Sequence, residues 1–273
     1  QPPKGTKDDA AHTFKPVYVS VGHAISLTSA VALVTACCKH RIPEPVRLAD
    51  LEGRDAVRNL PAQELEESTE AEQQQEGTTC APCSKPVLSR TGLVYDPAMM
   101  DHRDPSDSES STHPECPERI SSIYQRLDEA GLAQRCARVP SRRATRAELE
   151  TVHSVAHVDT VMQIGDMDAS CRQRLARGWN SVFLSGGSTE ASLLAAGSVT
   201  ELVMRVVRGE LDNGVAVVRP PGHHAECGCA MGFSLFGNVA VATRAARAAG
   251  VERVLIVDWD VHHGNGTEAI FYE

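Results

Sequence analysis

The sequence predicts an α/β fold with a largely parallel sheet from about residue 89 onward, and three observations lead to it. Short apolar runs alternate there with segments of helical periodicity. Two of the apolar runs pass directly into clusters of His, Asp and Gly, where open α/β sheets place their ligand sites. The chain has 273 residues, 41% of them hydrophobic, which is enough for one sizeable core.

The first elements of this fold lie in the region 91–131. The apolar run Thr91–Asp96 predicts a strand. After a polar loop, Pro117 and Glu118 are typical of a helix start, and Gly131 is typical of a helix end. The apolar residues between them recur at helical spacing and share one face: Ile120, Ile123, Tyr124 and Leu127.

The later elements alternate in the same way. Thr189–Glu210 carries a long helical pattern, and an Asp-Asn-Gly turn separates it from an apolar strand at Val215–Val218. A third helix is expected at Asn238–Ala249, followed by the strongest strand, Arg253–Val257. Because that last strand is apolar on both faces, we expect it to be buried.

Residues 1–89 differ in composition and are expected to form a poorly ordered extension. Within it, the stretch 63–77 has six glutamates and no basic residue, which predicts a solvated acidic linker. Cys80 and Cys83 form a Cys-x-x-Cys pair, but no second pair stands at zinc-ribbon spacing, so a metal or redox site is the less favoured interpretation.

Charge, cysteine content and hydropathy exclude some classes of protein. The formal charge of −9 argues against a general basic surface, so direct sequence-specific nucleic-acid binding is not expected. Nine cysteines at irregular spacings in a chain of this length favour a reducing compartment over a secreted disulfide framework. The apolar run Ala24–Cys38 is shorter than the roughly 20 residues that cross a bilayer, so no membrane contact is expected.

The first polar cluster, residues 219–226, follows the strand Val215–Val218. Its sequence is Arg-Pro-Pro-Gly-His-His-Ala-Glu, in which two prolines stiffen the exit from the strand and present His223 and His224 side by side. A tandem His pair alone is weak evidence, but its place at the carboxyl end of a strand favours a functional site.

The second cluster, residues 258–266, follows the strand Arg253–Val257. If the strand geometry persists, Asp258, Asp260 and His262 project to one face. Buried carboxylates need a cation or a full set of hydrogen bonds, and an Asp with a His suits zinc. We expect Asp260 and His262 as ligands, Asp258 as a carboxylate that orients a neighbouring imidazole, and a third ligand beyond Glu273.

Other polar and aromatic residues have less specific patterns. The His-Pro-Glu run 113–115 and Arg119 by themselves indicate helix capping and surface charge. His153 and His157, at spacing i and i+4, are either metal ligands or packed, hydrogen-bonded histidines, and the second is favoured. Phe233, which follows a glycine, is either a core residue or the wall of a pocket.

Five motifs in this order resemble the zinc-dependent class II histone deacetylases: TGLVYD, HPE followed by Arg, RPPGHHAE, MGFSLFGNVAVA and LIVDWDVHHGNGT. The resemblance covers residues 90–273. It implies a three-layer arginase/deacetylase-like fold of which this chain holds about the first half, so that the catalytic domain is incomplete at its C-terminus. Residues 1–89 show no resemblance that we can place.

The resemblance implies roles for the residues of both clusters. Asp260 and His262 match the first two zinc ligands, and the third, an Asp, is expected downstream. His224 matches the general base, later acid, that activates the attacking water, and His223 matches its electrostatic partner. The tyrosine that polarises the substrate carbonyl is also expected downstream, and Tyr272 does not match it.

The remaining site residues also follow from the resemblance. Asp258 and Asn265 match the residues that orient the two imidazoles, and Asp258 also matches a contact of a structural potassium ion. Gly232 and Phe233 match the wall of the acetyl-lysine tunnel, and Arg119 matches the arginine near its foot.

Departures from the family pattern refine this expectation. Asn265, where class I enzymes carry Asp, points to class II, and the loop before His113 lacks the cysteines of class IIa, which favours a class IIb-like enzyme. Changes at 234, 235 and 237, and the Cys-Gly-Cys run 227–229, put the tunnel shape in doubt, but not the metal.

The expected function is therefore a zinc-dependent hydrolase of N-acetyl-lysine in histones or in other proteins such as tubulin. Two alternatives stay open: an acetylpolyamine deacetylase or more distant ureohydrolase-like enzyme, and a non-catalytic interaction fragment. Expected partners are acetylated proteins, with corepressor or cytoskeletal proteins beside them. Nucleus and cytoplasm are both open as compartments, and a role in chromatin and transcription regulation is expected with the first.

Overall fold

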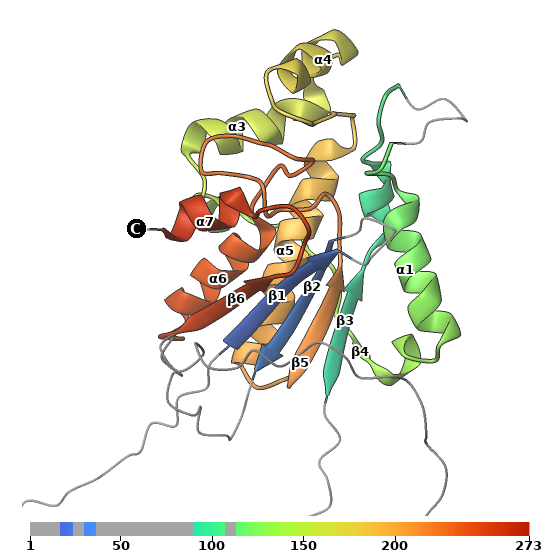
Figure 1. The fold of residues 1–273 in the computed structure, drawn as a ribbon, viewed down its shortest axis with the longest axis vertical. Helices are drawn as coiled ribbons and strands as arrows, with labels where there is room; N and C mark the ends of the chain where they lie inside the picture. Colours follow the sequence, from blue (N-terminus) through green and yellow to red (C-terminus); the bar gives the residue numbers. More distant parts are fainter. Residues whose placement is uncertain (1–16, 24–29, 37–89, 107–112, 273) are drawn as a thin grey trace, which may run out of the picture. The chain divides into compact units, whose positions relative to one another are not determined.

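The structure is a computed structural model that describes residues 17–23, 30–36, 90–106 and 113–272 (Figure 1). All of these belong to one compact unit of the chain. The acidic linker 63–77 and the pair Cys80 and Cys83 lie outside the described residues, so the expectations for them are not tested.

The described strands form one six-stranded sheet in the order β4-β3-β5-β2-β1-β6. Strand β3 pairs in parallel with β4 and β5, and β1 pairs in parallel with β6, whereas β2 is antiparallel to both of its neighbours. Among these six strands, therefore, only β2 runs against the others. Their bounds are β1 Val17–His23, β2 Ala30–Ala36, β3 Thr91–Tyr95, β4 Ala137–Arg138, β5 Asn213–Val217 and β6 Val254–Asp258.

Strands β1 and β2 lie between β5 and β6, the two strands that precede the polar clusters. The sequence does not predict these strands, because the apolar run 24–38, which includes β2, lacks the alternation of apolar and polar residues that marks a half-buried strand. The rest of the extension 1–89 lies outside the described residues, so its expected disorder stays a prediction.

Helices pack on both faces of the sheet, with α5 and α6 side by side on one of them (Figure 1). The α-helices are α1 Glu118–Glu129, α2 Arg146–Leu149, α3 Val155–Gln163, α4 Ala169–Arg177, α5 Ser188–Val207, α6 Asn238–Ala248 and α7 Asn265–Phe271. Short 3-10 turns span Pro97–Asp101, Ala133–Arg135 and Ile164–Asp166. The predicted helices and strands from residue 91 onward are confirmed as α1, α5, α6, β3, β5 and β6, with bounds that differ by up to three residues.

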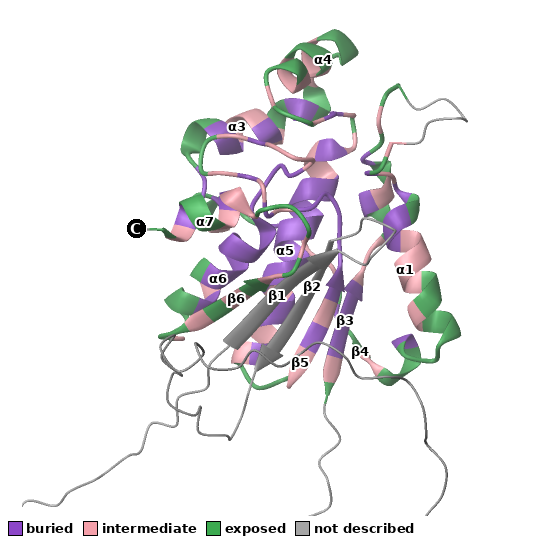
Figure 2. Cartoon of the chain, in the orientation of Figure 1, coloured by how far each residue is buried: buried purple, intermediate pink, exposed green. Residues whose placement is uncertain are grey.

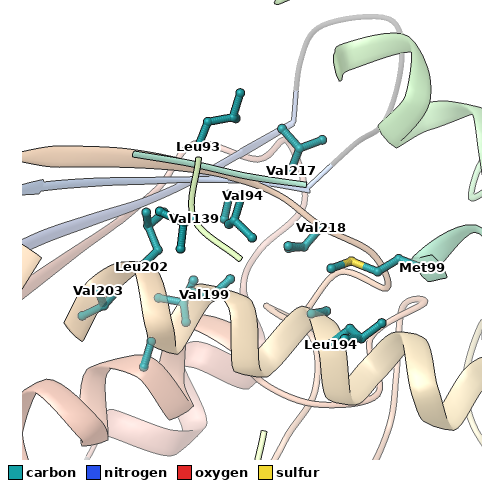
Figure 3. Close-up of a cluster of buried hydrophobic side chains, with 14 of the residues drawn as sticks. Leu93, Val94, Met99, Val139, Leu194, Val199, Leu202, Val203, Val217 and Val218 are labelled. Carbon is teal, nitrogen blue, oxygen red and sulfur yellow. The ribbon is translucent and has the colours of Figure 1, made fainter. Parts of the chain in front are cut away.

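The main core lies between the sheet and α5. Figure 3 shows Val94 and Val139 pointing toward Val199 and Leu202 of α5, while Leu93 points to the opposite face of the sheet. Consecutive strand residues alternate in this way, so β3 contributes apolar side chains to both faces. Ile120 of α1 is fully buried in the same cluster.

Strand β6 corrects one expectation. It lies at the edge of the sheet, and Leu255 and Val257 are 53% and 44% exposed (Figure 2). The apolar composition predicted burial on both faces, but among the described residues only the face with Val254 and Ile256 packs against the core. Within the described part of the chain, no helix is both long enough and apolar enough to span a membrane.

Helix α5 closely approaches the loop between β4 and α2 at Gly197. A Cβ atom there would overlap the carbonyl oxygen of Arg142 and the amide nitrogen of Ala144, whose N–H donates to Leu193 at 2.8 Å. Glycine is needed here because two backbones meet, and the loop leads toward α2 and α3.

We predict that Gly197→Ala destabilises the fold by about 1–3 kcal/mol, because the overlapping backbone atoms must move apart. The sign is opposite to the gain of ~1 kcal/mol that alanine usually brings to a helix interior. Urea unfolding measures the change. Gly186→Ala is the control, since nothing lies within 4 Å of a Cβ at that position. A stability of Gly197→Ala equal to that of the wild type would contradict the close approach.

Candidate active site

The two polar clusters meet at the carboxyl ends of β5 and β6. His223 Nδ1 lies 2.9 Å from Oδ2 of Asp258, and His224 Nδ1 lies 2.7 Å from Oδ1 of Asn265. Strand β6 ends at Asp258 and α7 begins at Asn265, so the second cluster forms the turn between them. Each imidazole of the first cluster therefore has its own polar partner in the second.

The tandem imidazoles differ in their surroundings. Their ring centroids are 4.0 Å apart, so a positive charge on one disfavours a charge on the other. Burial lowers the pKa of His224, as do the neighbouring rings of His223 and His262, against the opposing effect of the hydrogen bond to Asn265. His224 is thus held neutral near pH 7, in the form that can accept a proton.

Asp260 and His262 supply two adjacent donors of the kind that zinc prefers. The side chain of Asp260 is 1% exposed, and its Oδ1 lies 3.1 Å from Nδ1 of His262 and 3.7 Å from Nε2 of His223. The carboxylate and the imidazole fit two positions of a zinc site. No group of three or more His, Cys, Asp or Glu side chains with metal-ligand placement occurs in the described residues. An open pocket of about 510 Å³ borders the pair.

The potassium ion implied for Asp258 has no support in the described contacts. One carboxylate oxygen of Asp258 faces His223, and the other accepts a hydrogen bond from the backbone N–H of Asp260 at 3.1 Å. Those contacts fit the expected orienting role of this carboxylate.

The expected tunnel residues lie directly beside His224. Gly232 has φ +52°, and a Cβ atom there would overlap the His224 ring, so only glycine fits. Phe233 follows with φ +68°, a conformation that non-glycine residues rarely adopt. Its ring lies edge-on to His113, with the centroids 5.2 Å apart. The backbone at 232–233 thus turns sharply against the His224 ring, and Phe233 is half-buried.

A buried ion pair, which the sequence does not predict, supports the loop that carries the tandem histidines. Arg219 is 2% exposed and binds the carboxylate of Glu115 through Nε at 2.9 Å and Nη2 at 2.5 Å. Its Nη1 donates to the carbonyl oxygens of Met99 and His102. Burial alone raises the pKa of Glu115, but the bonds from Arg219 and the surrounding charges outweigh it and lower the pKa.

Glu115 corrects the surface-charge interpretation of the run 113–115, since it is 1% exposed. Arg119 corrects it as well, at 4% exposed, because α1 turns this side chain inward. Nη1 of Arg119 lies 3.7 Å from Glu115, and its Nε and Nη2 are buried without a hydrogen-bond partner in the described part of the chain. Burial lowers the pKa of Arg119 to about 10.

His153 and His157 are hydrogen-bonded, as the favoured interpretation held. Nδ1 of His153 lies 2.9 Å from the carbonyl oxygen of Glu226, and its Nε2 accepts from the N–H of Gly237 at 2.9 Å. Nε2 of His157 lies 2.8 Å from the carbonyl oxygen of Leu235. Together they fix the loop 226–237, which carries the tunnel residues.

Comparison with known proteins agrees with these motifs. The family model described as "Histone deacetylase domain" matches residues 113–273, and a model described as "Endonuclease V" matches residues 5–51, a range that includes β1 and β2. Histone deacetylase 5 of Arabidopsis thaliana is 48% identical over 189 residues, which cover 67% of this chain and 28% of that protein. Histone deacetylase 9 of Homo sapiens is 41% identical over 207 residues, covering 67% and 20%.

A solved structure shows the same fold. The crystal structure of the HDA15 HD domain superposes with a TM-score of 0.61 at 39% identity, covering 68% of this chain and 50% of that one. The expected arginase/deacetylase-like fold is confirmed. The chain spans half of that solved chain and between a fifth and a third of the curated relatives.

We predict that Glu115→Ala destabilises the fold by about 3–5 kcal/mol, because it leaves the Arg219 guanidinium buried without its counter-charge. The midpoint of urea unfolding measures the loss. Glu129→Ala is the matched control: it removes the carboxylate of an exposed pair with Arg126, and the midpoint should not move. Equal midpoints for the two variants would contradict the role of the buried pair.

Proposed function

The chain belongs to the histone deacetylase family, and on that premise we propose that its site takes part in the zinc-dependent hydrolysis of N-acetyl-lysine. One observation carries the proposal. The tandem imidazoles of His223 and His224 hold separate polar partners with their Nδ1 atoms, beside the Asp260–His262 donor pair. A proton-accepting group and a metal-ligand pair are therefore adjacent, as metal-assisted amide hydrolysis requires.

Asp260 and His262 would hold the zinc ion. When bound, zinc supplies Lewis-acid polarisation of the amide carbonyl and lowers the pKa of a water molecule. A catalytic zinc usually has three protein ligands, and the third that the family resemblance implies is not among the described residues.

His224 is proposed as the general base and then acid. Its Nδ1 is engaged with Asn265, so its Nε2 accepts the proton of the attacking water and later returns it to the leaving lysine amine. The lowered pKa of His224 keeps the imidazole in the accepting form at neutral pH. His223, oriented by Asp258, supplies the electrostatic partner on the side of Asp260.

Phe233 and Gly232 would form the wall along which the acetyl-lysine side chain enters. Arg119 lies deeper, and Asp260 is among the charges that act on it. Its Nε and Nη2 atoms, which have no described hydrogen-bond partner, suit a carboxylate, and acetate is the anion that the reaction releases. Arg119 is therefore proposed to bind the acetate product.

Histones are the proposed substrate, since the names of both curated relatives state that activity for those proteins. The same proposal includes tubulin and other acetylated proteins as substrates, and corepressor or cytoskeletal proteins as partners. It places the activity in the nucleus or the cytoplasm. The acidic balance of the chain favours recognition of the acetylated protein itself rather than of DNA.

We predict that the 273-residue chain binds Zn²⁺ weakly, and that His262→Ala removes this binding because it deletes one of the two proposed ligands. Isothermal titration with zinc chloride measures it, in a Cys80→Ser/Cys83→Ser background that removes the Cys pair. His263→Ala is the matched control, since that neighbouring ring is exposed and pairs with Glu268 at 2.6 Å. Undiminished binding by His262→Ala would contradict the assignment of this ligand.

We predict that the 273-residue chain by itself hydrolyses no acetyl-lysine peptide, and that the protein purified from its natural source hydrolyses it with zinc. In the natural protein, His224→Ala should lower kcat by about 10²–10⁴-fold, the usual contribution of a general base. His263→Ala should leave kcat unchanged. Release of acetate is the measurement. Preference for N-acetylputrescine would indicate the polyamine alternative, and absence of turnover in the natural protein would indicate the non-catalytic one.

A further inference from the structure

Glu226 lies two residues after His224, and its side chain reaches α7. Its Oε1 accepts a hydrogen bond from Nδ2 of Asn265 at 2.9 Å, and Oδ1 of that asparagine faces Nδ1 of His224 at 2.7 Å. The three side chains therefore form a chain of hydrogen bonds from a carboxylate through an amide to an imidazole.

The direction of each hydrogen bond in this chain follows from what the groups can donate. A carboxylate only accepts, so the Asn265 atom that faces Glu226 is the NH₂ group. The planar amide then turns its oxygen toward His224. That oxygen also only accepts, so Nδ1 of His224 carries the hydrogen and Nε2 carries the lone pair.

We propose that Glu226 is a positioning residue that selects this tautomer of His224 by fixing the orientation of the Asn265 amide. Without a carboxylate at 226, the amide can rotate by half a turn and present its NH₂ group to His224. The imidazole then carries its hydrogen on Nε2 and has no lone pair there to accept a proton. This inference rests on the proposed function in one respect, that His224 acts as the general base.

The backbone of Glu226 is held from two sides. Its N–H donates to the carbonyl oxygen of Cys229 at 3.0 Å, and its own carbonyl oxygen faces Nδ1 of His153 at 2.9 Å. Because Nε2 of His153 accepts from Gly237, the hydrogen of this neutral ring sits on Nδ1 and points at Glu226. The buried His153 thus fixes the residue from which the carboxylate reaches Asn265.

The test reads the tautomer directly by NMR of the 273-residue chain labelled with ¹⁵N-histidine, at a pH where the rings are neutral. Long-range ¹H–¹⁵N correlations distinguish a protonated Nδ1 from a protonated Nε2, and His224→Ala identifies the signal. We expect Nδ1–H in the wild type and a mixture of both tautomers in Glu226→Gln, whose amide can donate as well as accept. Glu268→Gln, a carboxylate exchange on the exposed side of α7, should leave the signal unchanged.

A second variant separates tautomer selection from a merely structural contact. Asn265→Asp offers an oxygen to His224 in either orientation, so in that background Glu226→Gln should no longer change the tautomer. In the natural protein, Glu226→Gln should lower kcat about two- to tenfold with KM unchanged, and Asn265→Asp should remove this sensitivity.

Two results would overturn the inference: an Nε2–H tautomer in the wild type, or an unmixed Nδ1–H tautomer in Glu226→Gln. Neither depends on zinc or on turnover, so a failure of the deacetylase proposal stays distinguishable. If the tautomer shifts as expected but the natural protein hydrolyses no acetyl-lysine, the selection by Glu226 holds and only the role of His224 as base falls.

Discussion

The buried pair of Arg219 and Glu115 is the contact on which the rest of the site depends. Arg219 lies two residues after the end of β5, and Glu115 precedes α1, 104 positions earlier in the chain. The guanidinium also takes up the carbonyl oxygens of Met99 and His102, so one side chain ties the loop after β3 to the loop that carries the tandem histidines. A charged pair taken out of water is stable only when nearly every donor is used, and this geometry leaves little freedom to either loop.

The site built on that contact is organised by hydrogen-bond direction more than by net charge. His153, His223 and His224 each use Nδ1 toward an oxygen, on Glu226, Asp258 and Asn265 respectively. A neutral imidazole has one donor and one acceptor, so in His153 and His224 an oxygen at Nδ1 leaves the acceptor at Nε2. In His153 that acceptor binds the backbone N–H of Gly237, whereas Nε2 of His223 lies on the side of Asp260. Histidine thus has a structural role at position 153 and a proposed chemical role at position 224, and in both an oxygen atom lies at Nδ1.

The clusters meet although their strands are not neighbours. Strands β1 and β2 separate β5 from β6, so the contact between the clusters is made by the loops at the carboxyl ends and by α7, not by the ladder. The edge position of β6 also leaves Leu255 and Val257 exposed on the face that the described helices do not cover. Asp258, at the end of β6, is therefore held by His223 and by the backbone N–H of Asp260. No described helix packs on Leu255 and Val257.

The sequence by itself determined α1, α5, α6, β3, β5 and β6 and the identity of both clusters, because periodicity, capping residues and short motifs are local signals. It did not determine the strands β1 and β2, the exposed face of β6, or the burial of Glu115 and Arg119. Those depend on pairings between residues far apart in the chain, such as Arg219 with Glu115, and no local pattern in the sequence indicates such pairings. Glu226 is part of the motif RPPGHHAE, but only the tertiary structure decided its partner. Helix α7 must pack against the loop 219–226 before Asn265 can contact both the Glu226 carboxylate and His224.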